Sequence, residues 1–362
     1  MEEALFIELL QVAVGRRRSL SRTPSDEEWH SIYQMAVKQA VAGVCFCAVQ
    51  RLHACGQVPP QLLIGEWFAT ADAIRKTSER TDRRCQKVQK KLLQAGIRSS
   101  ILKGQAVARY YGHTLAPYRQ PGDIDVFADC GLQGALRFAH NCGLTDVKWD
   151  YKHLRLEVFS STDVELHYRV EVLLNPFRNY DLQRWFRQHE QLLFSPCGEL
   201  VAPTTAFNRF YILLHIYRHF LYEGVGLRQL MDYYYVLLAD DDADAHQPFV
   251  LDDALRRFGM WRFTRGVMWL MQYVFALPAE RLICEPLESE GRFILDEVMA
   301  GGNFGHYDER LAGLRGGRLH TVLSVCRHNL HLLKHYPSEV PWPPVWFVWH
   351  KCWKWWTKQK NR

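Results

Sequence analysis

Apolar positions recur at helical spacing in both flanks of the chain and at strand spacing in its middle. A capping-box sequence opens a predicted helix over residues 25–55, and a second helix is predicted over residues 61–94. Residues 97–202 alternate short apolar strands with short helices. After Pro203 the helical period returns, with helices predicted over residues 204–222, 227–239, 251–275, 287–299 and 319–335.

This order of elements predicts an α+β fold, with a small mixed β-sheet core held between helical segments. We expect four parts: an N-terminal helical segment over residues 1–95, the core over 96–202, a C-terminal helical domain over 203–340, and an amphipathic tail over 341–362.

Two carboxylates stand two residues apart in the apolar run Gly122-Asp123-Ile124-Asp125-Val126. On a β-strand they point to the same face, roughly 7 Å apart. Converging carboxylates repel each other, and a hard divalent ion such as Mg²⁺ resolves that repulsion. A lone Asp-x-Asp also arises by chance on solvent-facing strands, so its neighbours decide the interpretation.

The segment before this pair has the features of a phosphate site. A short strand over residues 97–102 is followed by Lys103-Gly104 and a helical stretch through Tyr111. A helix start after glycine presents free N–H groups and a positive dipole end to an anion. Lys103 and Arg119 add cations for phosphate oxygens, and Gly122 allows close approach of a phosphate.

A third carboxylate follows in Val164-Glu165-Leu166-His167, where strand alternation places Glu165 and His167 on one face. Three carboxylates on neighbouring strands beside a glycine turn are typical of two-metal phosphoryl chemistry. His167 has three interpretations: nucleotide contact, proton transfer, or a supporting hydrogen bond.

The motifs LKG, YY, R-x-x-GDID and VELH resemble the uncharacterised nucleotidyltransferase family of the DNA polymerase β-like superfamily. A stretch from His215 to Asp232 resembles the C-terminal half of that family, so the resemblance covers about residues 95–240. It implies a polymerase β-like core that uses Mg²⁺ or Mn²⁺ and an NTP, with ATP expected. Carried over by position, the metal-binding and catalytic residues are Asp123, Asp125 and Glu165, and the nucleotide-binding residues are Lys103, Gly104, Arg119, Gly122 and His167.

The resemblance implies transfer of a nucleoside monophosphate to an acceptor hydroxyl or phosphate. A small molecule or protein is favoured as acceptor, because the core lacks a basic stripe with interleaved aromatic residues. Two departures are visible: lysine precedes the single Gly104 of the turn, and the third acid is Glu165 in place of the commoner aspartate. Two other classes stay open: a catalytically silent nucleotide-binding or regulatory module, and a scaffold or membrane-surface protein whose tryptophan-rich tail docks on a membrane or partner.

Charge and cysteine content add modest limits. The net charge of +6 over 362 residues does not require a polyanionic partner. The ten cysteines include no Cys-x-x-Cys, and no secretory signal or run of eighteen apolar residues is found. We therefore expect reduced thiols and a cytoplasmic protein.

Histidines at helical spacing are candidate metal ligands. His215 and His219 stand four residues apart, and His328, His331 and His335 share a second helical face. Packing, hydrogen bonding or a solvated face explains both sets more simply. Arg228 and Asp232 form an i,i+4 pair that we expect to brace its helix.

The C-terminal tail is rich in tryptophan and lysine. Trp342, Trp346, Trp349, Trp353 and Trp356 follow helical spacing, with Lys351, Lys354 and Lys358 elsewhere around the helix. Residues 342–356 suit docking on the protein body or on a second copy, where tryptophan is a favoured anchor. They also suit a membrane surface. A free tail is the third alternative, and docking is the favoured prediction.

Overall fold

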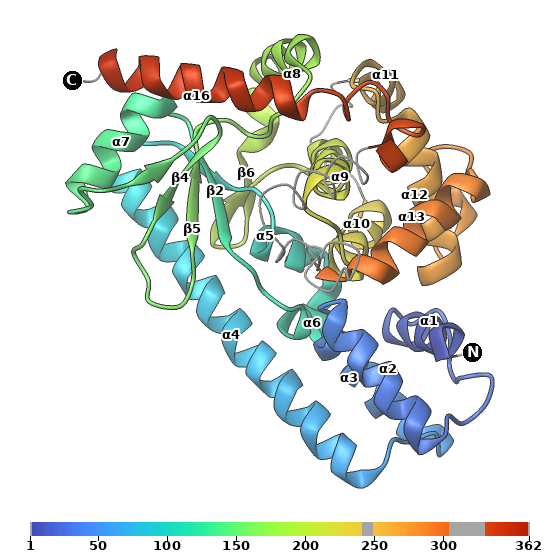
Figure 1. The fold of residues 1–362 in the computed structure, drawn as a ribbon. Helices are drawn as coiled ribbons and strands as arrows, with labels where there is room; N and C mark the ends of the chain where they lie inside the picture. The colour runs from blue at the N-terminus through green and yellow to red at the C-terminus, as the bar shows by residue number, and fades with distance from the viewer. Residues whose placement is uncertain (1, 241–248, 304–329, 361–362) are drawn as a thin grey trace, which may run out of the picture.

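The protein, described by a computed structural model over residues 2–240, 249–303 and 330–360, combines a mixed sheet with helices from both flanks (Figure 1). The sheet has the order β1-β2-β5-β4-β3, in which β2 and β5 are parallel and the other pairs are antiparallel. Its strands are β1 Ser99–Ile101, β2 Ile124–Ala128, β3 Lys148–Trp149, β4 His153–Leu156 and β5 Val164–His167. A separate hairpin is formed by β6 Ser195–Cys197 and β7 Leu200–Ala202.

Helices make up most of the described chain. Before and within the sheet they are α1 Glu2–Ala13, α2 Asp26–Lys38, α3 Ala42–Leu52, α4 Gln61–Gln94, α5 Gln105–Ala108, α6 Gly112–Leu115 and α7 Gly131–Asn141. After the sheet they are α8 Pro176–Gln188, α9 Thr205–Tyr222, α10 Leu227–Leu238, α11 Leu251–Arg257, α12 Trp261–Phe275, α13 Glu288–Gly301 and α16 Pro343–Lys360.

One face of the sheet is apolar and is covered by α4 and α7. Ile124 and Val126 of β2 and Leu166 of β5 pack there against Val88 of α4 and Phe138 of α7. Strand alternation sends Asp125, Glu165 and His167 to the opposite face. The sheet core thereby fixes which side chains reach the helices on that other side.

The helices of the two flanks share one hydrophobic core. α1 packs on both α3 and α12, so the N-terminal and C-terminal helical segments touch directly (Figure 1). α9 and α10 lie in the interior of this cluster, where Tyr211, Tyr217 and Tyr234 are fully buried. The helices around the sheet therefore come from both ends of the chain. The division into four parts stays a prediction.

Several predicted helices differ in their limits. The capping box at Ser25 is confirmed, but the helix predicted over residues 25–55 is broken into α2 and α3 at Ala40, whose φ is +56°. Gln39 explains the break, because its side chain bonds the N–H of Leu227 at 2.9 Å and the carbonyl of Val298 at 2.9 Å. The helix predicted over 251–275 is likewise two helices, separated at Gly259 (φ +73°).

Other predictions were incomplete. The structure adds α1, which was not predicted, and most of the helix predicted over 319–335 lies outside the described residues. The helix predicted over 61–94 is confirmed as α4. Among the described helices, none combines the length and apolar character needed to cross a membrane.

The tail forms α16, which lies across the outside of the molecule beside α7 and α8 (Figure 1). Trp346, Trp349 and Trp353 each meet Tyr151 edge-on, with ring centroids 4.9–5.3 Å apart. Lys354 Nζ donates to the carbonyl of Trp149 at 2.7 Å. Of the alternatives weighed for the tail, the structure has docking on the protein body.

Candidate active site

The parallel pairing of β2 with β5 brings two of the predicted carboxylates side by side. Asp125 and Glu165 are partners in the register of the two strands, so their side chains leave the sheet from neighbouring positions on one face. Asp123 directly precedes β2 and lies at the exposed rim of the site. The three acids, predicted from two separate motifs, therefore lie close to one another.

Asp125 is buried and is held by a lysine and a histidine. Lys103 Nζ lies 3.1 Å from Asp125 Oδ1, and His167 Nε2 lies 3.0 Å from the same oxygen. Burial alone would raise the pKa of Asp125, but Lys103 and His167 outweigh it and lower that pKa. Burial also opposes the charge of Lys103, yet Asp125, Glu165 and Glu171 keep the pKa of the ammonium raised.

Glu165 lies between two histidines. Its Oε1 is 3.3 Å from His153 Nε2, and its Oε2 is 3.4 Å from His167 Nε2. These contacts outweigh partial burial and lower the pKa of Glu165. Burial opposes protonation of His167, but its bonds to Asp125 and Glu165 dominate and raise the pKa of the imidazole.

Asp123 is the acid whose ionisation the site disfavours. Desolvation in the cleft, followed by repulsion from Asp125 and Glu165, raises the pKa of Asp123 to about 6. The side chain nonetheless remains open to solvent at the rim. Repulsion from Asp125 is the second cause of the raised pKa, after desolvation.

His153, Glu165 and His167 form a group that could hold a metal ion. One donor atom from each residue lies within 4.8 Å of the others. His153 Nε2 lies 3.3 Å from Glu165 Oε1, His167 Nε2 lies 3.4 Å from Glu165 Oε2, and His167 Nε2 lies 3.0 Å from Asp125 Oδ1. The donor set, two imidazole nitrogens with carboxylate oxygens, therefore fits a divalent cation.

Sequence reasoning missed His153, since it lies outside the recognised motifs. It enters the site because β4 pairs antiparallel with β5, which sets His153 opposite His167. Their rings stack with centroids 5.1 Å apart. The available signal was the strand alternation of His153-Leu154-Arg155-Leu156 next to a strand already carrying Glu165.

Behind Lys103 a chain of buried polar groups fixes its position. Lys103 Nζ lies 3.1 Å from His215 Nε2, and His215 Nδ1 lies 3.1 Å from Glu171 Oε2. Burial and the positive charge of Lys103 lower the pKa of His215 well below its usual range. The neutral ring thus accepts from the ammonium through Nε2 and donates from Nδ1 to Glu171, whose other oxygen meets Lys152 at 3.1 Å.

This arrangement gives His215 a hydrogen-bonding role, in agreement with the simpler of its two interpretations. His219 makes a contact of 2.8 Å with Glu223. In the second set, His331 lies 3.4 Å from Glu297 and His335 lies 2.9 Å from Glu290, while His328 falls outside the described residues.

The predicted glycine turn has the expected backbone requirement. Gly104 adopts φ +63°, a conformation that glycine tolerates best, and a Cβ there would lie 3.7 Å from the carbonyl oxygen of Asp123. α5, which follows, is only four residues long. Gly122 lies beside Arg228, whose Nη1 would be 3.2 Å from a Cβ at that position.

Arg119 lines the cleft but is engaged by Asp232. Its Nε and Nη2 donate to the two oxygens of Asp232 at 2.6 and 2.7 Å, and the Tyr111 hydroxyl adds a third bond at 2.7 Å. Arg228 donates to the carbonyl of Gln120 at 3.1 Å. Asp232 thus receives a bidentate bond from Arg119, while the expected Arg228–Asp232 brace and contact of Arg119 with phosphate stay predictions.

A cleft of about 260 Å³ lies between the sheet and helices α9 and α10, and Asp125 joins it to the group formed by Glu165, His153 and His167, which lies behind its lining. Its lining includes Lys103, Gly104, Asp123, Asp125 and Arg228. The cleft thus joins a cluster of carboxylates to cations at the glycine turn, which is the combination that a metal-bound phosphate ester requires.

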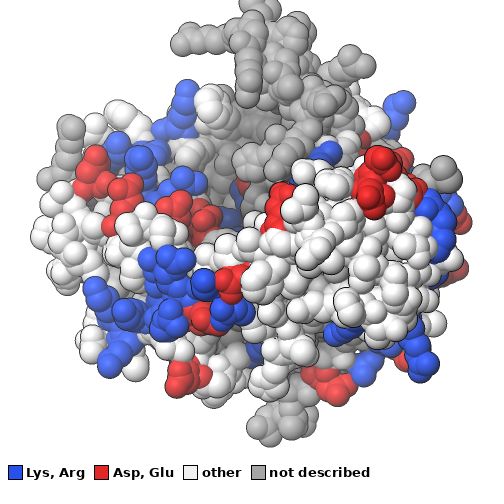
Figure 2. Space-filling model, turned by 90° about the horizontal axis from the view of Figure 1, so that it is seen from below, with Lys and Arg blue, Asp and Glu red and all other residues white. Residues whose placement is uncertain are grey.

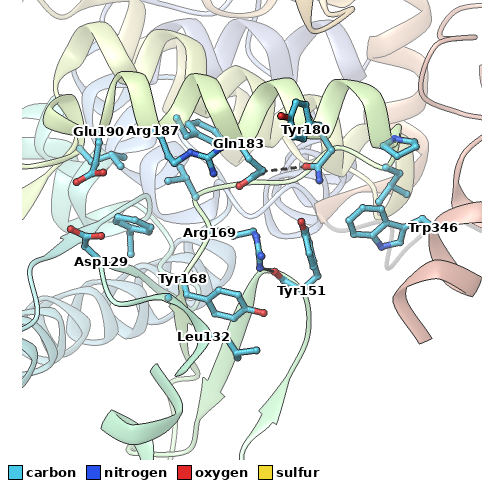
Figure 3. A pocket seen from close by; sticks show the side chains of 18 of the residues that line it. Asp129, Leu132, Tyr151, Tyr168, Arg169, Tyr180, Gln183, Arg187, Glu190 and Trp346 are labelled. Atoms are coloured by element: carbon cyan, nitrogen blue, oxygen red, sulfur yellow. Dashed lines mark hydrogen bonds between the residues drawn. The ribbon is translucent and has the colours of Figure 1, made fainter. Parts of the chain in front are cut away.

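A second cavity, of about 690 Å³, lies at the opposite end of β2 and shares no lining residue with the cleft. Tyr180, Gln183 and Arg187 reach it from α8, and Tyr151, Tyr168 and Arg169 face them from the sheet side (Figure 3). Trp346 of α16 closes one end (Figure 3). Arg169 packs over the Tyr151 ring at 3.8 Å, so part of this lining is already paired.

Comparison with known proteins gives one match. The model of a family described as "Uncharacterised nucleotidyltransferase" matches residues 25–276, which include every predicted site residue. No curated protein and no solved structure matches the chain.

Proposed function

The chain belongs to the uncharacterised nucleotidyltransferase family, and we propose that it transfers a nucleoside monophosphate from an NTP to an acceptor hydroxyl or phosphate. The observation that carries the proposal is the pairing of Asp125 with Glu165 on parallel strands, next to Asp123 and the Lys103-Gly104 turn. The sheet supports a polymerase β-like core, because both acids leave one face of adjacent strands.

The divalent cation is proposed to bind at Asp125 and Glu165, with Asp123 from the rim and His153 and His167 as nitrogen donors. When bound, it supplies positive charge to the phosphate oxygens. Nitrogen donors suit Mn²⁺ and Zn²⁺ better than they suit Mg²⁺. Binding of Mn²⁺ that is tighter than that of Mg²⁺, and that weakens in a His153→Ala variant, would support this donor set in calorimetry.

Protein side chains have separate tasks in the proposed reaction. Lys103 and Arg228 are the cleft cations that would meet the phosphates, and the His215–Glu171 chain holds Lys103 in place. The acceptor oxygen attacks the α-phosphorus, the bond to the bridging oxygen breaks, and pyrophosphate leaves. The acceptor proton passes to a carboxylate at the rim. Burial of the site limits water as a competing acceptor.

The direct test is incubation of the full chain with each of the four NTPs, labelled on the α-phosphate, with Mn²⁺ or Mg²⁺ and cell extract. We expect label to appear on one class of molecule and pyrophosphate to be released, and we expect neither with Asp125→Asn. Label transfer that is equal for the wild type and the variant would contradict the proposal.

A second candidate is nucleotide binding without turnover. It is favoured by the contact of Lys103 with Asp125, which already places a cation against the central carboxylate. Nucleotide binding that depends on Lys103, with no pyrophosphate release under any acceptor or metal tested, would favour this candidate.

A further inference from the structure

α16 carries basic and aromatic residues and no acid. From Trp342 to the end of the chain the sequence contains no aspartate or glutamate, while lysines recur at 351, 354, 358 and 360. The helix lies along the outside of the molecule (Figure 1). Its charge is therefore of one sign over its whole length.

The inward side of α16 is already used. Trp346 and Trp353 pack on Tyr151, Trp353 also meets Trp149 at 5.6 Å, and Lys354 bonds the Trp149 carbonyl. These contacts hold the helix on the body without help from its other side chains.

The outward side is apolar and open. Of the sixteen large apolar side chains exposed in the described chain, six lie on α16: Val345, Phe347, Val348, Trp349, Trp355 and Trp356, of which Trp349 belongs to the side packed on Tyr151. Phe347, Val348 and Trp355 are 59%, 63% and 65% exposed. Their concentration on one 18-residue helix exceeds what scattered surface hydrophobes explain.

Lysines border this apolar side. By helical spacing, Lys351 and Lys358 lie on the same flank as Phe347, and both are exposed. Lys351 Nζ lies 4.2 Å from the centre of the Phe347 ring. An exposed strip of aromatic and aliphatic side chains bordered by lysines is the composition of helices that lie in a membrane interface.

We propose that the outer face of α16, defined by Phe347, Val348, Lys351, Trp355 and Lys358, binds the surface of a membrane containing anionic phospholipids. The helix lies on that surface and does not cross it. Phe347, Val348 and Trp355 enter the boundary between headgroups and acyl chains, and the lysines meet the lipid phosphates.

The charge of α16 favours an anionic membrane over a second copy of the chain as the binding partner of its outer face. α16 offers no acid to pair with the lysines of a second copy, so contact between two outer faces would gain no ion pair. An anionic lipid surface supplies the opposite charge for Lys351 and Lys358.

α4 shows why charge alone is insufficient. Lys and Arg also gather over the C-terminal half of α4 (Figure 2), including the exposed Arg83, Lys87, Lys90 and Lys91. Exposed large apolar side chains are sparse there, with Leu93 as the example in that half. The α4 surface therefore provides a charge control for α16 in the same molecule.

The test is sedimentation of the full chain with vesicles of phosphatidylcholine alone or with 30 mol% phosphatidylserine, a composition chosen for the assay as roughly that of an anionic leaflet. We expect binding to the anionic vesicles, weakened by salt, and little binding to the neutral ones. Phe347→Ser with Trp355→Ser should weaken binding at least about tenfold. Lys351→Gln with Lys358→Gln should weaken it about thirtyfold.

Matched controls carry the same chemistry elsewhere. Lys87→Gln with Lys90→Gln removes equal charge from α4, and Leu62→Ser removes an apolar side chain that is 91% exposed. Both should bind like the wild type. Quenching of wild-type tryptophan fluorescence by brominated lipids gives a readout that needs no variant.

Three results would overturn the proposal: no binding to anionic vesicles at low salt, equal loss in the α4 and α16 lysine variants, or tryptophan fluorescence unaffected by brominated lipid. Concentration-dependent dimerisation of the wild type that Trp355→Ser abolishes, without lipid binding, would assign the face to a second copy and also overturn it.

Discussion

Asp125 and Asp232 are both buried near the same cleft, and they differ in how their charge is balanced. Asp232 receives both ends of the Arg119 guanidinium and the Tyr111 hydroxyl, so one carboxylate meets one fixed cation. Asp125 meets Lys103 and His167, but Glu165 and Asp123 add two further negative charges. The balanced cluster is suited to holding the fold, and the cluster with surplus negative charge is suited to binding a cation.

The largest expected effect on activity comes from the cluster with surplus negative charge. Asp125→Asn should lower metal-dependent transfer by about 10³-fold or more, because the central oxygen ligand loses its charge. Lys103 and His167 would lose their counter-charge, so some loss of stability is expected as well. Initial rates of pyrophosphate release, with circular dichroism to verify folding, measure both effects.

Asp129→Asn is the matched control for that variant, because Asp129 follows the other end of β2 and lines the second cavity. It should leave transfer unchanged. An Asp125→Asn protein that is folded and transfers at the wild-type rate would remove Asp125 from the site.

Substitutions in the balanced cluster around Asp232 should change the free energy of unfolding. Asp232→Ala leaves the buried Arg119 guanidinium without its carboxylate, and we expect a loss of roughly 3–5 kcal/mol in the free energy of unfolding. The double variant Arg119→Met with Asp232→Leu should cost less, since no charge is left unpaired. Urea unfolding measures both, and a loss below about 1 kcal/mol for Asp232→Ala would make the pair dispensable.

The local motifs predicted the acidic part of the site because strand alternation is a local property. Asp125, Glu165 and His167 lie on one face for the reason given by their spacing. The partners that balance them come from distant segments. His153 requires the β4–β5 register, His215 requires the packing of α9 against Lys103, and the Arg119–Asp232 bond joins residues 113 positions apart.

Helix limits failed for a related reason. The break at Ala40 follows from bonds of Gln39 to residues 188 and 259 positions away, and no local pattern at residues 38–42 indicates them. For the tail, by contrast, a local pattern was sufficient, because tryptophan spacing predicted a docking helix and Trp346, Trp349 and Trp353 lie on its packed side. Trp355 lies on the open side of the same helix.

Lys103 is part of the glycine turn and borders the proposed cation site. Its substitution therefore tests whether the cluster with surplus negative charge also serves NTP binding. Lys103→Met should weaken NTP binding about ten- to a hundredfold, because a charged contact to phosphate contributes roughly 1.5–3 kcal/mol. Lys87→Met on exposed α4 should have no effect. Unchanged affinity in a calorimetric titration of Lys103→Met would restrict Lys103 to its ion pair with Asp125.

The smallest expected effect concerns the pH response of Asp123. Its pKa of about 6 lies above that of an unfolded aspartate, so the folded state binds the extra proton between about pH 4 and pH 6. In metal-free buffer the protein should therefore lose stability as pH rises through that window, and Asp123→Asn should remove this loss.

The pH dependence of cation binding has the opposite sign, because only the ionised carboxylate of Asp123 binds a cation. Mn²⁺ affinity should fall about tenfold from pH 7 to pH 5 in the wild type relative to Asp123→Asn. Since His167 is retained in both proteins, the difference between the two profiles isolates Asp123. Parallel profiles in calorimetric Mn²⁺ titrations would exclude Asp123 as a ligand and leave Asp125, Glu165 and the histidines to bind the cation.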